Sequence, residues 1–349
     1  MKKLLFLCIV AVLCSCSSSD TTVKTINAEQ VAEKNAEIGT LVDLAERVEE
    51  IPLESCGGAM LDNISDIVPY KNLLLILNGG KCSLFNKEGN FISHLGTKGN
   101  GPQEYLYIED AFARNDTIYL YDSSKNRILL FNQQGAYIKS VEFKENMGHS
   151  RGTAMLPNGQ FAFYLPDKGE HPTWRTLTIF DASGAVVDSI ARDTKLSRFS
   201  NINWYFKEGS FTEYKDVVNF KYTFNDTIYR LVDIKGKLHA QPAYVFALGS
   251  AAAIENAREE VIKTMMQPKM FDPFKTMAKI ELLGESSKYL FFKINGERGY
   301  FYNKYSGELC KYNPEPYMPF KLDSGGSLWC VKASENGDNN PIIVRAEIK

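Results

Sequence analysis

Residues 116–143 read Asp116-Thr-Ile-Tyr-Leu-Tyr-Asp-Ser-Ser-Lys-Asn-Arg-Ile-Leu-Leu-Phe-Asn-Gln-Gln-Gly-Ala-Tyr-Ile-Lys-Ser-Val-Glu-Phe143, which predicts three β-strands joined by two turns. The runs from Ile118 to Tyr121 and from Arg127 to Phe131 are apolar and of strand length. The segment from Asn132 to Gly135 supplies a tight turn, because glycine adopts positive φ without steric cost. Weaker copies of this pattern lie on both sides of it.

The copies are marked by turn glycines at positions 89, 135, 184, 236 and 307. The intervals between these glycines are 46, 49, 52 and 71 residues, and the last interval contains an inserted segment. Periods of roughly 45 to 50 residues with several strands per unit are typical of β-propeller blades. The sequence therefore predicts an all-β propeller.

The two ends of the chain predict how the ring closes. After Tyr317 only three strand-like runs remain, which is one strand short of a full blade. The segment from Arg47 to Leu53 alternates polar and apolar residues, and its Pro52 suits an edge strand. We expect this N-terminal strand to complete the last blade, since an open blade would expose an unpaired edge. The prediction is a six-bladed β-propeller over residues 47–349.

Residues from about 250 to 277 interrupt the repeat between the fourth and fifth copies. Ser250 precedes a run with helical spacing, and a stretch rich in Met and Phe follows it. We interpret this segment as a helical insertion between blades 4 and 5 that covers blade edges. A Met-rich groove for a partner is the alternative.

The first residues have the pattern of an export signal. Lys2 and Lys3 precede an apolar run from Leu4 to Leu13, which is too short to span a membrane. The next residues, through Cys16, resemble the lipobox of bacterial lipoproteins, in which the cysteine is acylated; an ordinary secretory signal is the alternative. Residues 1–15 are therefore interpreted as a lipoprotein signal peptide, and residues 16–46 as a tether or linker. The expected location is the outer membrane, facing either the periplasm or the cell surface.

Charge and cysteine content limit the partners. The net charge is −2 and no basic stripe is present, so nucleic acid is not an expected partner. The expected partners are the membrane, through the lipid anchor, and a ligand or envelope protein whose identity the sequence does not give. Four cysteines remain after Cys16, and their pairing is open: Cys56, Cys82, Cys310 and Cys330. Their wide spacing lacks the C-x-x-C pairs of a structural zinc site.

At the level of family, the chain resembles the six-bladed β-propeller lipoproteins of Bacteroidota, relatives of NHL-type and TolB-like propellers. The resemblance rests on four segments: Ile51–Glu54, Gly99–Tyr105, Phe224–Tyr229 and Asn339–Val344. It implies the propeller fold and a location in the cell envelope. It implies no catalytic residues, since most members are uncharacterised.

Two places could hold a binding site. The glycine-rich stretch from Gly96 to Pro102 lacks the Lys and Ser/Thr of a phosphate-binding loop, so we read it as a loop between blades. Asn100, Glu104 and Tyr105 in and after this stretch could offer hydrogen-bonding groups and a ring to a sugar or peptide. Asp66 and Asp110 occupy equivalent places in the first strands of blades one and two and could line the axial channel.

The leading hypothesis is a membrane-anchored propeller that binds a ligand or partner protein through one face of the disk without catalysis. No catalytic residue, metal ligand or cofactor is predicted. One alternative is a metal-dependent hydrolase or lyase acting on a glycan, lactone or peptide, which would require Ca²⁺ or Zn²⁺ held by residues from several blades. A structural subunit of an envelope complex is the other alternative.

Overall fold

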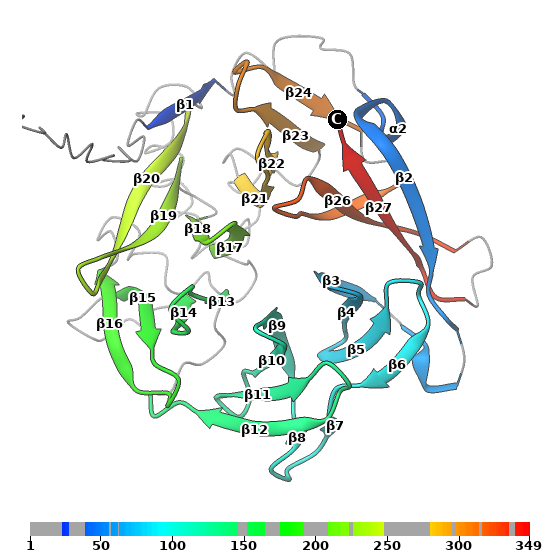
Figure 1. Cartoon of the computed structure of the whole chain (residues 1–349), viewed down its shortest axis with the longest axis vertical. Helices are drawn as coiled ribbons and strands as arrows, with labels where there is room; N and C mark the ends of the chain where they lie inside the picture. The colour runs from blue at the N-terminus through cyan, green and yellow to red at the C-terminus, as the bar shows by residue number, and fades with distance from the viewer. Residues whose placement is uncertain are drawn as a thin grey trace, which may run out of the picture.

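The computed structural model describes residues 23–27, 39–55, 57–61, 63–145, 152–164, 175–191, 209–222, 226–247, 280–294, 298–313, 316–334 and 339–349. Its strands form sheets arranged around a common centre, which is the arrangement of a β-propeller (Figure 1). The predicted signal peptide at 1–15, the predicted acylation site Cys16 and the predicted helical insertion at 250–277 lie outside the described residues.

Four sheets are antiparallel meanders in which consecutive strands are neighbours. Their strands are β3 (Ile64–Tyr70), β4 (Leu73–Asn78), β5 (Lys81–Asn86) and β6 (Phe91–His94); β9 (Ile108–Arg114), β10 (Thr117–Asp122), β11 (Arg127–Asn132) and β12 (Tyr137–Glu142); β13 (Thr153–Met155), β14 (Phe161–Tyr164), β15 (Arg175–Phe180) and β16 (Val186–Ala191); and β17 (Gly209–Tyr214), β18 (Val217–Tyr222), β19 (Thr227–Ile234) and β20 (Lys237–Ala247). A parallel strand, β1 (Lys24–Asn27), is added to the outer edge of β20.

The remaining large sheet has eight strands in the order β2-β27-β26-β25-β21-β22-β23-β24. A single parallel bridge, Gly284 to Leu322, joins its two four-stranded halves. Its strands are β2 (Ala45–Pro52), β21 (Ile280–Glu285), β22 (Tyr289–Ile294), β23 (Arg298–Asn303), β24 (Leu309–Tyr312), β25 (Met318–Leu322), β26 (Ser327–Lys332) and β27 (Ile342–Ile348). The short elements are β7 (Thr97–Lys98), β8 (Glu104–Tyr105), α2 (Leu41–Leu44) and the 3-10 turn η1 (Gly57–Ala59).

Strand β10 shows why the middle strands are continuously apolar. Ile118 and Leu120 pack against the β3–β6 sheet, whereas Tyr119 and Tyr121 pack against the β13–β16 sheet. The ring of Tyr121 meets that of Phe163 edge to face, with 5.0 Å between centroids. Successive residues of a strand point to opposite faces, so a strand buried on both faces needs apolar residues throughout. The core of the molecule therefore lies between neighbouring sheets.

Two of the turn glycines found in the sequence, Gly89 and Gly184, lie where neighbouring sheets pack closely. Gly89 and Gly184 have φ of +91° and +82°, in the left-handed region that favours glycine. A Cβ at Gly89 would lie 2.1 Å from the carbonyl oxygen of Pro52, and one at Gly184 would lie 2.1 Å from that of Glu142. Pro52 ends β2 and Glu142 ends β12. Each of these turns thus rests on the end of the outermost strand of the preceding sheet.

The two ends of the chain meet in the β2–β27 pair. The strands are antiparallel, with a register that runs from Ala45 opposite Ile348 to Pro52 opposite Ile342. The strand was predicted over Arg47 to Leu53 and is found two residues earlier at its start. β2 ends the sheet order, so Pro52 sits on an edge strand, where its missing N–H breaks no internal ladder.

Part of the predicted tether is folded, which corrects the expectation that residues 16–46 form only a linker. Lys24–Asn27 is β1, and Ile26 within it is 1% exposed and packs against Tyr244 and Phe246. Farther along, Gly39 bridges in parallel to Tyr312 on the outer strand β24. The pattern was missed because a four-residue strand on an edge has no periodicity of its own.

Helix α2 lies in the same corrected segment. Thr40 caps it: the backbone N–H of Thr40 donates to Asp43 Oδ2 at 2.8 Å, and the N–H of Asp43 donates to Thr40 Oγ1 at 3.4 Å. The Thr40 hydroxyl also donates to Asp43 Oδ2 at 2.6 Å, and this hydrogen bond, followed by the one from the Thr40 backbone N–H, holds the pKa of Asp43 below its ordinary value. Leu41 is buried in the core beneath the helix, so this turn packs on the propeller and leads the chain into β2.

Candidate functional site

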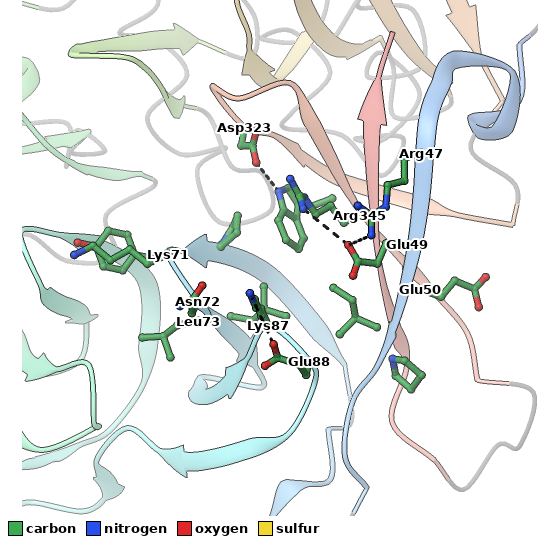
Figure 2. A pocket seen from close by; sticks show the side chains of 16 residues that line it. Arg47, Glu49, Glu50, Lys71, Asn72, Leu73, Lys87, Glu88, Asp323 and Arg345 are labelled. Carbon is green, nitrogen blue, oxygen red and sulfur yellow. Dashed lines mark hydrogen bonds and ion pairs between the residues drawn. The ribbon is translucent and has the colours of Figure 1, made fainter.

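A groove lies where the two chain ends meet (Figure 2). One wall is the strand pair β2 and β27, and the other is made by the β3–β4 and β5–β6 turns. Its volume is about 610 Å³, within the roughly 300–1,000 Å³ of small-molecule sites. The lining residues are Arg47, Glu49, Glu50, Ile51, Pro52, Pro69, Tyr70, Lys71, Asn72, Leu73, Leu74, Lys87, Glu88, Asp323, Trp329 and Arg345.

Arg345 of β27 is the most connected side chain of the first wall. Its Nη1 lies 3.9 Å from Glu49 Oε2 and its Nη2 lies 3.2 Å from Glu347 Oε1. Its Nε donates to Ser327 Oγ at 3.2 Å. The guanidinium carbon lies 5.9 Å from the centre of the Trp329 ring, which adds a cation–π contact. Four partners therefore hold one planar set of donors in a fixed orientation.

Trp329 is held from its other side by Asp323, which follows β25. The indole Nε1 donates to Asp323 Oδ2 at 2.9 Å (Figure 2). The backbone N–H of Ser327 donates to Asp323 Oδ1 at 2.9 Å. Trp329 is 7% exposed, so little of its ring is open to the groove. Trp329 therefore positions the side chains of Arg345 and Asp323, and its ring is not available for stacking against a ligand.

The second wall is fixed by a contact to the β9–β10 turn. The backbone N–H of Asp116 donates to the Tyr70 hydroxyl at 3.0 Å, and the Lys71 ammonium pairs with the Asp116 carboxylate. The hydrogen bond from Lys71 lowers the pKa of Asp116, and the same bond raises the pKa of Lys71. The ring of Tyr70 and the charge of Lys71 are therefore oriented before any ligand arrives.

The charges that line the groove balance. Four lining side chains are cationic, namely Arg47, Lys71, Lys87 and Arg345, and four are anionic, namely Glu49, Glu50, Glu88 and Asp323. Most of them have a partner of opposite sign, such as Lys87 with Glu88 at 3.9 Å and Lys332 with Glu50 at 2.9 Å. A charged ligand would have to displace one of these pairs, whereas an uncharged ligand can hydrogen-bond to both members. The groove is best suited to an uncharged, hydrogen-bonding ligand.

The predicted loop residues lie on the β7–β8 segment, away from this groove (Figure 1). The Glu104 carboxylate accepts a hydrogen bond from the backbone N–H of Gly101 at 2.6 Å and so holds its own loop. The Tyr105 ring is 3% exposed and packs in the core, and burial raises its pKa to about 12. Asn100 is exposed. The expectation that Tyr105 presents a ring to a ligand is therefore wrong, because the core needed an aromatic residue there.

Three buried or half-buried side chains hold this loop. Lys125 Nζ donates to the carbonyl oxygens of Gly99 at 2.6 Å and Glu104 at 2.9 Å. Arg127 Nη2 donates to the carbonyl oxygen of Gly101 at 3.2 Å. The fully buried Asp122 accepts the backbone N–H of Leu106 at 3.1 Å and of Tyr107 at 3.3 Å. The carbonyl oxygens of the loop glycines Gly99 and Gly101 accept two of these hydrogen bonds. This agrees with the interpretation of the loop as a connection between blades.

Asp66 and Asp110 do occupy equivalent positions. Each accepts the backbone N–H of the residue after it, Ile67 at 2.8 Å and Ala111 at 2.9 Å. Their remaining contacts differ: Asp110 Oδ2 accepts the Thr153 hydroxyl at 2.5 Å, and Asp66 Oδ2 lies 3.9 Å from Lys321 Nζ. Each carboxylate therefore links its innermost strand to that of a neighbouring sheet.

A second charged cluster lies between the β17–β20 and β21–β24 sheets. Glu285 is fully buried, and its Oε1 accepts Arg230 Nη2 at 3.0 Å, the Tyr244 hydroxyl at 2.9 Å and Lys304 Nζ at 2.8 Å. Its Oε2 accepts Asn219 Nδ2 at 2.7 Å. Burial, and then the charge of Glu285, raise the pKa of Tyr244. Four donors satisfy this carboxylate, so the cluster joins two sheets.

The described cysteines are free thiols. Cys82 and Cys330 are buried, Cys310 is exposed, and Cys56 lies outside the described residues. Burial raises the pKa of Cys82, and it raises the pKa of Cys330 to about 12. The thiolate is the reactive form, so these two thiols are unreactive while the protein is folded.

We expect iodoacetamide at pH 8 to alkylate Cys310 in the folded protein and to leave Cys82 and Cys330 unmodified. All three should react once guanidinium unfolds the chain. Peptide mapping by mass spectrometry measures each site separately and serves as its own control. Rapid alkylation of Cys330 in the folded protein would contradict its burial.

No group of three His, Cys, Asp or Glu side chains that could hold a metal ion occurs within the described ranges. His94 uses both ring nitrogens: Nδ1 lies 3.0 Å from Ser83 Oγ and Nε2 lies 2.6 Å from the carbonyl oxygen of Gly58. In the part of the chain that the structure describes, helices are all too short or too polar to cross a bilayer.

The groove was missed in the sequence because its walls come from four distant segments, near residues 47–52, 69–74, 87–88 and 323–345. Only the pairing of β2 with β27 brings them together. The alternating segment from Arg47 to Leu53 was the available signal, since a strand that joins the chain ends must face the first sheet.

Comparisons with known proteins agree with the fold. A family model described as "Domain of unknown function (DUF4934)" matches residues 23–346. A crystal structure named "Putative exported protein" from Bacteroides fragilis is 15% identical, covers 94% of this chain and 100% of its own, and has a TM-score of 0.67. A structure named "putative gluconolactonase" is 11% identical, covers 90% of this chain and 98% of its own, and has a TM-score of 0.51. At these identities the likeness shows the fold alone. No curated protein matches the chain.

Proposed function

The chain belongs to the family described as Domain of unknown function (DUF4934), and from this premise we propose that it is an exported, membrane-anchored propeller that binds a ligand or partner protein without catalysing a reaction. The family match begins at residue 23, one residue before β1, so the proposed binding unit includes the folded part of the N-terminal segment. We propose that the residues before residue 23 serve in export and membrane anchoring.

The proposed disk has six blades, with the eight-stranded sheet counted as two and β2 as the closing strand. Two observations support this count. Only the bridge between Gly284 and Leu322 joins the halves of that sheet, whereas strands within each half pair along most of their length. Pro52 of β2 also packs on the turn glycine of the next sheet as Glu142 of β12 packs on Gly184. β2 therefore occupies the position of an outermost blade strand.

The observation that carries the binding proposal is the groove beside β2, with its balanced charges and fixed side chains. Preorganised donors and acceptors lose little conformational entropy when a ligand binds. The pairs Glu49 with Arg345 and Asp323 with Trp329 give this groove planar polar groups in set orientations. An uncharged ligand, such as a neutral oligosaccharide, fits these groups better than an anion or a cation.

Filling the groove tests this proposal. Asn72 is exposed in the β3–β4 turn and lines the groove, so Asn72→Trp should block it. Asp216→Trp, in the equivalent β17–β18 turn, is the matched control; the preceding residues Lys71 and Lys215 share φ of 52° and 54°. Native mass spectrometry would screen neutral oligosaccharides, uronic-acid oligosaccharides and short peptides.

We expect a neutral oligosaccharide to bind the wild type and the control and to lose at least tenfold in affinity for Asn72→Trp. A ligand that binds all three proteins equally would place the site elsewhere. Absence of binding by every probe class would refute ligand binding at the groove.

The anchor of the proposed protein is the acylated Cys16, and its proposed location is the outer membrane. The lipobox-like residues before Cys16 support this, and one acyl chain alone would hold the protein only weakly, so more than one is expected. Cys16→Ala should release the protein from the membrane fraction, with Cys310→Ser as a control that stays bound. Membrane retention of Cys16→Ala would rule the anchor out.

A further inference from the structure

Strand β1 fixes the point at which the anchoring segment reaches the propeller. It pairs in parallel with β20, from Lys24 opposite Tyr244 to Asn27 opposite Ala247. Lys24 Nζ also donates to the carbonyl oxygen of Lys304 at 3.2 Å, and Ile26 is buried. The tether therefore begins at the outer edge of β20 and not at a freely moving chain end.

The length of chain before β1 matches the distance to the β19–β20 turn. Cys16 precedes Lys24 by eight residues, and Gly236 of the turn precedes Tyr244 by eight residues. Eight residues span at most about 26–29 Å. The acylated cysteine can thus reach the level of the turn but hardly beyond it.

The turn itself carries groups suited to a bilayer surface. Ile234 is 41% exposed at its start, and Lys235 and Lys237 are exposed beside it. Two acidic side chains lie beside it and are engaged in backbone hydrogen bonds: Asp233 accepts the N–H of Gly236 at 2.7 Å, and Asp188 of β16 accepts the N–H of Leu238 at 2.9 Å. β20 has 11 residues, the longest strand among those described, so the turn stands at the end of an extended hairpin.

We infer that the β19–β20 turn is a second membrane contact, in which Ile234 enters the interfacial layer and Lys235 and Lys237 meet the phosphates of an anionic bilayer. The inference rests on the acylation of Cys16 in the proposed function. An exposed apolar side chain next to lysines is the arrangement that interfacial anchors use. Each lysine near an anionic surface strengthens binding about fivefold.

Such contacts are too weak to bind a free protein, but the anchor changes their effect. A short tether raises the effective concentration of the turn at the surface to the millimolar range, so weak contacts suffice to orient the molecule. The groove beside β2 lies across the ring from β20 (Figure 1). The orientation therefore directs the groove away from the bilayer.

The test uses the acylated full chain with Cys56→Ser and Cys310→Ser, which leaves the buried Cys82 and Cys330. One reporter cysteine is introduced by His239→Cys, at an exposed position of β20 near the turn, and the control reporter by Glu88→Cys, in the groove wall. Each is labelled with a fluorophore and bound to vesicles of phosphatidylcholine and phosphatidylglycerol that carry a nitroxide quencher in the headgroup region. We expect at least twofold stronger quenching at 239 than at 88.

A triple variant tests whether the side chains of the turn, and not the shortness of the tether alone, bring residue 239 close to the membrane. Ile234→Ser, Lys235→Gln and Lys237→Gln together should abolish the excess quenching at 239 while the protein stays on the vesicles. Equal quenching at 239 and 88 would overturn the inference, and so would an unchanged excess in the triple variant. Failure of the chain to be acylated or to bind vesicles would instead remove the anchoring proposal, and the inference with it.

Discussion

Replacing Glu285 with alanine is expected to lower the free energy of unfolding by about 3–5 kcal/mol, because removal of one partner leaves buried or half-buried charges without compensation. The carboxylate accepts hydrogen bonds from Arg230, Lys304, Tyr244 and Asn219. The Arg230 side chain is 33% exposed and can regain water, so the lower part of this range is the better expectation. Urea unfolding followed by tryptophan fluorescence measures the change.

Glu347→Ala is the matched control for this prediction. Glu347 also pairs with an arginine, Arg345, at 3.2 Å, but its side chain is 40% exposed. Exposed pairs contribute about 0.2–1 kcal/mol, so the control should unfold almost as the wild type does. Equal losses in the two variants would show that the buried cluster does not join the sheets as described.

Gly89→Ala is expected to cost about 2–5 kcal/mol. About 1–2 kcal/mol comes from forcing an L-residue into the left-handed region at φ +91°. A further 1–3 kcal/mol or so comes from the new Cβ, which would lie 2.1 Å from the carbonyl oxygen of Pro52. The same variant should widen the contact between β2 and the first sheet, and with it the groove.

Gly307→Ala separates the two costs. Gly307 has φ +74° in the equivalent turn of another sheet, and a Cβ there would meet no atom within 4 Å. Only the conformational cost of about 1–2 kcal/mol is expected. If both variants lose the same free energy in urea unfolding, the packing of Pro52 on Gly89 contributes nothing to stability.

The propeller fold could be predicted because its determinants are local and repeated. Each copy carries apolar strands and a glycine at positive φ, and the recurrence of that glycine at 89, 135, 184, 236 and 307 is visible without any contact information. A strand buried on both faces, such as β10, can also be recognised in the sequence, because it is a continuous run of apolar residues.

The groove and strand β1 could not be predicted in the same way. Their determinants are pairings between residues some 220 to 300 positions apart, such as Lys24 with Tyr244 and Ala45 with Ile348. Tyr105 shows a related limit. A tyrosine beside glycines is typical of both a ligand loop and a core anchor, and only its 3% exposure distinguishes them.

The N-terminal segment, which pairs with β20, β24 and β27 in turn, sets the order in which the protein can mature. The residues synthesised first bind strands that are synthesised late, and β2 pairs with β27, which spans Ile342–Ile348 at the other end of the chain. Loop closure over such distances is slow, and strand edges stay unpaired in the meantime. A chain truncated within β27 would leave β2 without its partner strand, so we expect its dependence on chaperones during folding to increase with every residue removed from β27.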